Sequence, residues 1–223
     1  ACQYSEDVAS LALQRMGTVP EITRQVLSSL ACLGGSGGLK LPGKVLNLTQ
    51  EAIRMHLLPA AVAQLITLHQ DDYAFTHDRV HEAAINLIGT DEKDRLHLRA
   101  ASLLAERANE DLSNDALFRV VHHVAAIKNA GLLRQSASRY RQLILLATRR
   151  AKSTGDYVSA LRFLQATQRM DAPLTAEEDF TFTLEAAECE FLHGNLSTAQ
   201  GHCTKLLSAP GNPTDKAIAA CMM

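Results

Sequence analysis

A histidine followed by an aspartate stands where a β-rich stretch gives way to a helix. The segment Tyr73–Ala84 reads YAFTHDRVHEAA, and His77 and Asp78 lie at its junction. An imidazole N–H can donate to an anion, and a carboxylate can accept from backbone amides. The pair therefore predicts a switch element. The structural alternative is that Asp78 caps a helix beginning near Arg79 while His77 is an ordinary boundary residue.

The residues before this junction predict a small winged-helix unit. Leu65–His69 (LITLH) is a β-prone run, and the polar residues 70–72 separate it from a second run that begins at Tyr73, so a β-hairpin is expected. Apolar residues at helical spacing predict upstream helices at residues 7–16, 20–34, 41–48 and 49–65. Three helices and a hairpin complete a winged helix, which we assign to residues 1–90.

A glycine-rich segment, Gly34–Gly38 (GGSGG), interrupts the predicted helices. A phosphate-binding loop would follow a strand and continue into Gly-Lys-Ser/Thr, whereas here a helix precedes and Lys40 is badly placed. We therefore expect a flexible loop between helices, without phosphate binding.

Composition favours a soluble, almost all-α protein of one or two domains. Of the 223 residues, 47% are hydrophobic, 21% are charged and only 4% are aromatic. The net charge is −2, so neither a polyanion nor a membrane surface is implied as a partner. No apolar run reaches the roughly 18 residues of a membrane span, and no secretion signal precedes the chain's first helix, so a cytoplasmic location is expected.

The cysteines agree with a reducing compartment. They are odd in number and lack C-x-x-C spacing, which favours buried thiols over disulfides or a zinc site: Cys2, Cys32, Cys189, Cys203 and Cys221. The chain opens with Ala1 and stops inside a helix predicted from Thr214, so we expect a piece of a larger protein.

The second half of the chain contains a repeat. Gly155-Asp156 and Ala160 recur as Gly194-Asn195 and Ala199, at an offset of 39 residues. The glycine would end one helix, the Asp or Asn would cap the next, and the small alanine would let the two helices approach. We therefore predict a helical, tetratricopeptide-like domain at residues 91–223, a superhelix whose groove would bind protein partners or adjacent domains.

Histidines and cysteines in this half could be imagined as metal ligands. Helices are also predicted at residues 91–109 and 117–127. The pair His122-His123 lies in the latter, but neighbours on a helix point about 100° apart, so core-edge positions are expected. Cys189 and His193, with His202-Cys203 nearby, are interpreted as small core residues, because the first copy of the repeat has other residues at the positions of the first two. No metal is predicted.

Charge weighs against DNA, a frequent partner of winged helices. Residues 1–90 contain six Lys/Arg against eight Asp/Glu, and the wing tip carries Asp71-Asp72, which would repel phosphates. Lys40 and Lys44 could still meet a DNA backbone, so a DNA-binding regulator with a helical effector domain is kept as an alternative. Motifs of hydrolases, metalloproteases, nucleotide-binding loops and kinases are missing from the sequence, so the chain itself is predicted to be non-catalytic.

Several segments together resemble a known family. FTHDRVHEAAINLI, followed by DRLHLRAASLLAE and LFRVVHHVAAI, is similar to the segment after the nucleotide-binding core of signal-transduction ATPases with numerous domains (STAND). ILLATRRAKSTGDYVSALRFLQAT resembles the repeat that follows there, and VASLALQRMGTVPEITRQVLSSLACLG resembles the entry to the winged helix. Such proteins carry Ser/Thr-kinase-like and sensor or histidine-kinase modules.

The resemblance implies a role for the His-Asp step. In switch ATPases of the broader class a Met-His-Asp step stands at this place, and its histidine contacts the β-phosphate of ADP. It therefore implies that His77 and Asp78 sense nucleotide in the intact protein, which would bind ATP or ADP with Mg, whereas this fragment would hold no cofactor. The departures are the glycines of Gly35–Gly38, Asp156-Tyr157 and His122, which stand where the family has other residues.

The resulting hypothesis is a regulatory, protein-interaction fragment of a multidomain signalling ATPase or sensor kinase. It would couple nucleotide state to partner binding and output, and self-association is left open. Besides the DNA-binding regulator, the remaining rival is a pure helical-repeat scaffold, in which His77 could be changed without consequence.

Overall fold

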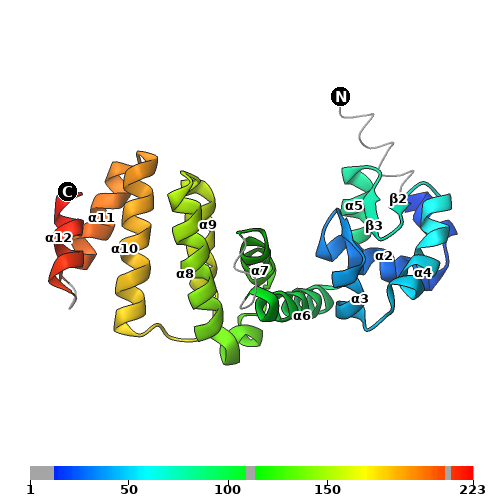
Figure 1. Ribbon diagram of the computed structural model, residues 1–223, viewed down its shortest axis with the longest axis horizontal. Helices are drawn as coiled ribbons and strands as arrows, with labels where there is room; N and C mark the ends of the chain where they lie inside the picture. Colours follow the sequence, from blue (N-terminus) through cyan, green and yellow to red (C-terminus); the bar gives the residue numbers. More distant parts are fainter. Residues whose placement is uncertain (1–12, 109–113, 209–211, 223) are drawn as a thin grey trace. The chain divides into compact units, whose positions relative to one another are not determined.

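The computed structural model describes residues 13–108, 114–208 and 212–222 (Figure 1). The chain forms two compact units, one extending to Leu103 and the other beginning at Leu104. Both are built mainly of helices, with one small antiparallel sheet in the first, so the predicted mostly α fold is confirmed. The predicted domain boundary after residue 90 stays a prediction; that position is the first residue of a helix that crosses the division between the units.

The first unit combines helices with a small antiparallel sheet, and its assignment as a winged helix stays a prediction. Residues 13–18 are helical, and the start of the helix predicted at residues 7–16 lies outside the described residues. The remaining elements are α2 (Glu21–Leu33), β1 (Ser36–Gly38), α3 (Lys40–Leu46), α4 (Gln50–Val62), β2 (Ile66–His69), β3 (Asp72–Phe75), α5 (Asp78–Ile85) and the start of α6 (Thr90–Ala108). The predicted hairpin is therefore present as β2 and β3.

Part of the glycine-rich segment, which we predicted to be a flexible interhelix loop, is the strand β1. β1 pairs antiparallel with β3, Ser36 opposite Ala74, and the strand order is β1-β3-β2. The Phe75 N–H donates to the Gly35 carbonyl at 2.9 Å. Backbone pairing needs no side chain, and glycine adopts the φ of 150° at Gly37 without strain. The loop prediction was wrong because its partner strand lies far along the sequence.

The core of this unit forms around α2. Leu27 and Leu30 of α2 are fully buried, as are Ile53 and Leu57 of α4. The Tyr73 side chain of β3 is buried as well, and its hydroxyl lies 3.2 Å from the Leu30 carbonyl and 3.0 Å from the Gly34 carbonyl. The Leu30 carbonyl also accepts from the Gly34 N–H that caps α2, and the Gly34 carbonyl lies just past the end of the helix. Tyr73 therefore fixes the sheet to this end of the helix.

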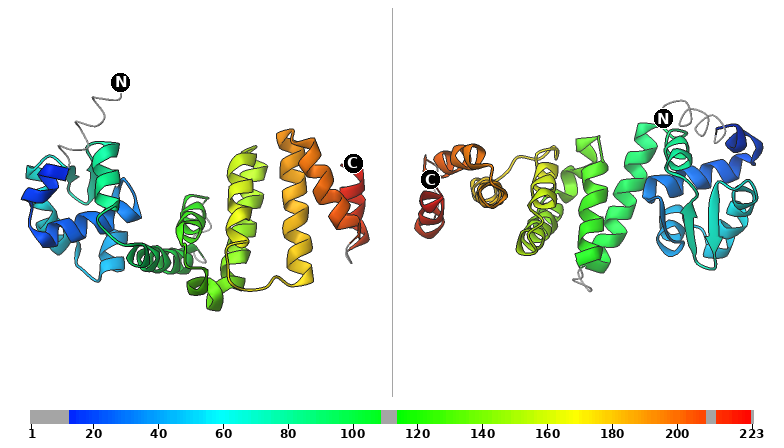
Figure 2. Two further views of the ribbon diagram at one scale, coloured as in Figure 1. Left: turned by 180° about the vertical axis from the view of Figure 1, so that it is seen from behind. Right: turned by 90° about the horizontal axis from the view of Figure 1, so that it is seen from above.

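The second unit consists of paired helices. Its elements are α7 (Asn114–Ala126), η1 (Ala130–Ser136), α8 (Ala137–Ser153), α9 (Tyr157–Thr167), α10 (Ala176–His193), α11 (Leu196–Ser208) and α12 (Pro213–Cys221). Helix α8 lies beside α9, and α10 lies beside α11 (Figure 2). Each pair is joined by a short turn, as in a helical hairpin.

The predicted repeat is visible in these turns. Gly155 and Gly194 both have positive φ, 80° and 91°, which glycine adopts without strain. The Asp156 side chain caps α9 by accepting from the Ser159 N–H at 3.1 Å. Ala160 and Ala199 are fully buried, as expected of small residues between closely packed helices.

Among the described residues, no helix is long and apolar enough to cross a membrane.

The glycine in α3 yields a prediction about stability. A Cβ at Gly43 would lie 2.9 Å from the Leu48 carbonyl oxygen, which is backbone and cannot move away cheaply. Gly43→Ala is therefore expected to lower the free energy of unfolding of the first unit by about 1–3 kcal/mol, measured by urea denaturation. Gly17→Ala is the matched control, because its Cβ meets nothing within 4 Å in a helical segment, and it should be neutral or stabilising. Equal stabilities for the two variants would contradict the packing argument.

Candidate functional site

His77 is the N-cap of α5. Its backbone is extended, with φ −157° and ψ 147°, and its Nδ1 accepts a hydrogen bond from the Arg79 N–H at 3.1 Å. The His77 carbonyl accepts from Val80 and His81, which begin the helix. Because Nδ1 is an acceptor, the neutral ring carries its proton on Nε2. The side chain is exposed, so this Nε2–H is available to a ligand.

In the structural alternative that we considered, Asp78 would cap the helix, but the structure gives this role to His77. Asp78 is the first residue of α5, and the cap is the preceding imidazole. In histidine, Nδ1 stands as many bonds from the backbone as the side-chain oxygen of Asn, so it reaches the same N–H. The exposed Asp78 carboxylate instead lies in the first turn, where it interacts favourably with the helix dipole.

The chain entering this cap is held by Thr76. Its hydroxyl lies 2.9 Å from the Gln64 carbonyl and 3.1 Å from the Leu65 carbonyl, and its N–H donates to the Leu65 carbonyl at 3.1 Å. These bonds join the end of β3 to the turn after α4. His77 is thus presented from a backbone fixed on its N-terminal side.

A second histidine, His81, holds α5 from inside. Its Nε2 lies 2.8 Å from the Ala31 carbonyl of α2, so Nε2 is the donor. The ring packs edge-on against Phe75, with centroids 5.0 Å apart. Sequence reasoning missed this role. The only local signal was the four-residue spacing from His77, which places the two histidines one helical turn apart.

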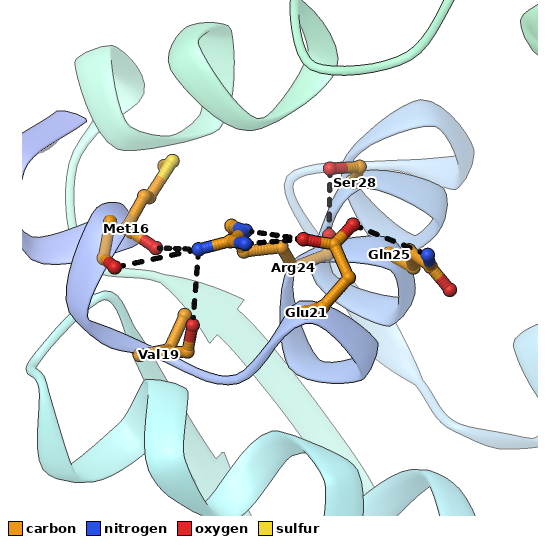
Figure 3. A network of polar contacts seen from close by, with 7 residues as sticks. Met16, Val19, Glu21, Arg24, Gln25 and Ser28 are labelled. Atoms are coloured by element: carbon orange, nitrogen blue, oxygen red, sulfur yellow. Dashed lines mark hydrogen bonds and ion pairs between the residues drawn. The ribbon is translucent and has the colours of Figure 1, made fainter.

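Arg24 fixes the turn that leads into α2 (Figure 3). Its guanidinium donates to the carbonyls of Met16, Gly17 and Val19 at 3.2–3.5 Å and to the Glu21 carboxylate. The hydrogen bond from Arg24, with a second from Gln25, holds the pKa of Glu21 below its usual value. Sequence reasoning did not find this network; the Glu-x-x-Arg spacing was its only signal.

In the second unit, α8 and α10 face each other through ion pairs. Arg141 pairs with Glu178 at 3.1 Å, Arg149 with Glu185 at 2.5 Å, and Lys152 with Glu185 at 2.6 Å and with Glu188. We call these six residues the ionic ladder. The Glu185 side chain is only 8% exposed, so its charge depends on these partners.

A pocket of about 210 Å³ lies at the Arg141 end of the ionic ladder. Leu145 and Phe182 supply apolar surface, and Gln142, Glu177 and Thr181 supply polar groups. This mixture suits an apolar side chain of a peptide with a donor beside it. Arg141 itself is committed to structure, because it also donates to the carbonyls of Ala172 and Pro173.

The predicted core role of two cysteines is confirmed. Cys189 and Cys203 are fully buried, and burial raises the pKa of the Cys189 thiol to about 11. His193 is exposed. Of the adjacent histidines, His123 is buried and His122 is exposed. Within the described ranges no three His, Cys, Asp or Glu side chains gather as metal ligands would.

No protein-family model and no curated protein matches the chain. Among solved structures, it is similar to a STAND protein with a tetratricopeptide repeat sensor from Pyrococcus horikoshii, with a TM-score of 0.47 and 14% sequence identity. The alignment covers 86% of this chain and 32% of that protein. The chain therefore spans about a third of that protein's length.

The cap of α5 can be tested by stability. His77→Ala removes the acceptor and should lower the free energy of unfolding by about 0.5–2 kcal/mol in urea denaturation. His77→Ser should retain most of the parent chain's unfolding free energy, because the serine hydroxyl can cap the helix. If both variants are as stable as the parent chain, the Nδ1 hydrogen bond contributes nothing.

The ionic ladder predicts a pH dependence. Burial lowers the pKa of Lys152, but the hydrogen bonds that its ammonium donates to Glu185 and Glu188 outweigh this and leave the pKa raised. A raised lysine pKa stabilises the fold below the unfolded value, and the contribution is lost as pH rises through the folded value. Lys152→Met should therefore destabilise the second unit by about 1–3 kcal/mol at neutral pH and flatten its alkaline stability loss.

Arg134→Met is the matched control for this prediction. Arg134 pairs with Asp171 at 4.0 Å, but both side chains are more than 60% exposed. Loss of this exposed ion pair should lower the free energy of unfolding by less than about 1 kcal/mol. Unfolding in urea, monitored by circular dichroism, gives the loss of unfolding free energy for each variant. If the two losses are equal, burial of the ionic ladder does not strengthen its contribution to stability.

Proposed function

We propose that this chain is the regulatory and protein-interaction segment of a multidomain signalling ATPase. His77 and Asp78 of the first unit would read the nucleotide state, and the paired helices of the second would bind a protein partner or an adjacent domain. ATP or ADP with Mg would be held by another part of the intact, cytoplasmic protein, which we expect to carry the catalysis.

The observation that carries this proposal is the hydrogen bond that the His77 ring accepts. The Arg79 N–H occupies Nδ1, so the proton of the neutral ring is on Nε2, in a residue that is exposed at the start of α5. The amino terminus of α5 adds a positive partial charge beside it. A donor held in one tautomer at a helix N-terminus suits a phosphate oxygen.

Hydrogen bonds of Thr76 and His81 connect His77 and α5 to the rest of the first unit. Thr76 joins the residue before the cap to the turn after α4, and His81 joins α5 to the end of α2. A ligand that holds His77 in one conformational state would therefore also influence the positions of α2 and α4. Such a ligand shifts the equilibrium only by its difference in affinity between the two states.

Partner binding by the second unit is supported by the α8–α10 surface. The ionic ladder fixes the spacing of these helices, and the pocket beside it offers both apolar and polar groups. A preformed surface spends little free energy on ordering when a peptide binds.

The DNA-binding alternative finds less support in the placement of charge. Lys40 and Lys44 lie on α3, whereas α4, the helix directly before the hairpin, directs Glu51, Met55 and Leu58 to solvent. The exposed side of α4 carries one carboxylate among apolar side chains, and its single arginine, Arg54, donates to the Gln70 carbonyl, so this helix is poorly suited to a phosphate backbone. Duplex binding that weakens steeply with salt would restore this alternative.

The decisive measurement is ADP release from the intact protein. Loss of one charge-assisted hydrogen bond of roughly 1.5–3 kcal/mol from the resting state should speed release about 10–100-fold in His77→Ala and raise basal output. His77→Ser should release ADP as fast while keeping its stability, because serine can cap α5 but is too short to reach the phosphate. His69→Ser, at an exposed histidine of β2, is the control.

Unchanged ADP release in both His77 variants, with native circular dichroism, would reduce His77 to a structural residue. The 223-residue chain alone is expected to bind ADP only weakly, and micromolar affinity in calorimetry would contradict the assignment of nucleotide binding to another part of the protein.

A further inference from the structure

One face of α4 is apolar, and none of the residues that the structure describes covers it. Met55, Leu58 and Val62 follow one another at helical spacing, and their side chains are 57%, 43% and 84% exposed. On the opposite side, Ile53 and Leu57 are fully buried in the core. Packing against the core requires only one apolar side of a helix, so the second apolar side needs another explanation. A continuous exposed apolar stripe of this kind marks an interaction surface.

The stripe borders a groove. A hollow of about 640 Å³ runs between α4 and the turn before α2, where Thr18 and Val19 form the opposite wall. Arg24 holds this turn by donating to the carbonyls of Met16 and Val19. The wall is therefore built into the unit, and the groove can receive a ridge of side chains from another helix.

Opposite charges stand at the two ends of this face. Glu51, exposed in the first turn of α4, lies on the same side as Met55, one helical turn before it. At the other end, Arg15 donates to the side chain of Gln64, two residues after the helix, at 3.4 Å. Leu58 stands near the middle of the span from Glu51 to Gln64.

We propose that this face binds the same face of a second copy of the chain, with the two α4 helices antiparallel. A two-fold axis at Leu58 places Met55 of one copy beside Val62 of the other. It also places Glu51 of each copy near Arg15 of the other, so each acidic end meets a basic end. A parallel pairing would instead bring like charges together, and two-fold symmetry makes both contacts occur twice.

The first test is sedimentation equilibrium of the 223-residue chain over a range of concentrations. The parent chain should show a monomer–dimer equilibrium, and Leu58→Glu should weaken dimerisation at least about tenfold, because it places two like charges at the axis. Val158→Glu is the matched control: Val158 is 54% exposed on α9, in the other unit, and its replacement should leave dimerisation unchanged. Circular dichroism verifies that each variant is folded.

A charge exchange tests the antiparallel arrangement. Glu51→Lys and Arg15→Glu should each weaken the dimer, and the double variant should restore it towards the parent affinity, because the opposite charges are then exchanged. A chain that remains monomeric up to its solubility limit would overturn the proposal and leave the face to a different protein. A dimer that tolerates Leu58→Glu, or that the double variant fails to restore, would overturn the assigned face or its antiparallel pairing.

Discussion

The first unit depends on how the carboxyl end of α2 is satisfied. Carbonyls of the last turn lack partners within the helix, and leaving them buried without hydrogen bonds would be costly. The Leu30 carbonyl accepts from the Gly34 N–H that caps the helix and from the Tyr73 hydroxyl, which also reaches the Gly34 carbonyl, and His81 donates to Ala31. One helix end thereby binds both β3 and α5. Because β3 is the central strand, the same contacts also place β1 and β2, and with them the cap at His77.

In the second unit, ion pairs join two of the helices. Helices α8 and α10 belong to successive hairpins, and the ionic ladder lies between them where an apolar seam could have stood. Buried ion pairs contribute modestly to net stability but penalise misaligned pairing heavily, because a shift would leave Glu185 buried without a partner. The ladder therefore fixes the register between the hairpins, and the adjacent pocket takes its shape from that register.

The order of elements in the first unit does not by itself decide what this unit binds. Function follows from the side chains that the fold leaves outside. Here these are an imidazole N–H at the start of α5 and an apolar face on α4 that ends in Glu51 and Arg15. The first suits an anionic group and the second suits protein, and Thr76 connects the two by joining the cap to the turn after α4.

The sequence by itself determined the features that arise within a few residues of chain. Apolar spacing located the helices, the turn residues located the hairpin, and Gly155 and Gly194 located the helix ends, because each of these signals is a local backbone or burial preference. Only the tertiary structure decided that the glycine-rich segment is a strand, that His81 rather than a neighbour holds α5, and that Glu185 joins α8 to α10. In each case the partner lies more than 30 residues away, and one sequence carries no local sign of which distant donor or acceptor will satisfy a buried group. The cap fell between these limits: the sequence placed it at His77-Asp78, and the geometry of the turn selected the imidazole.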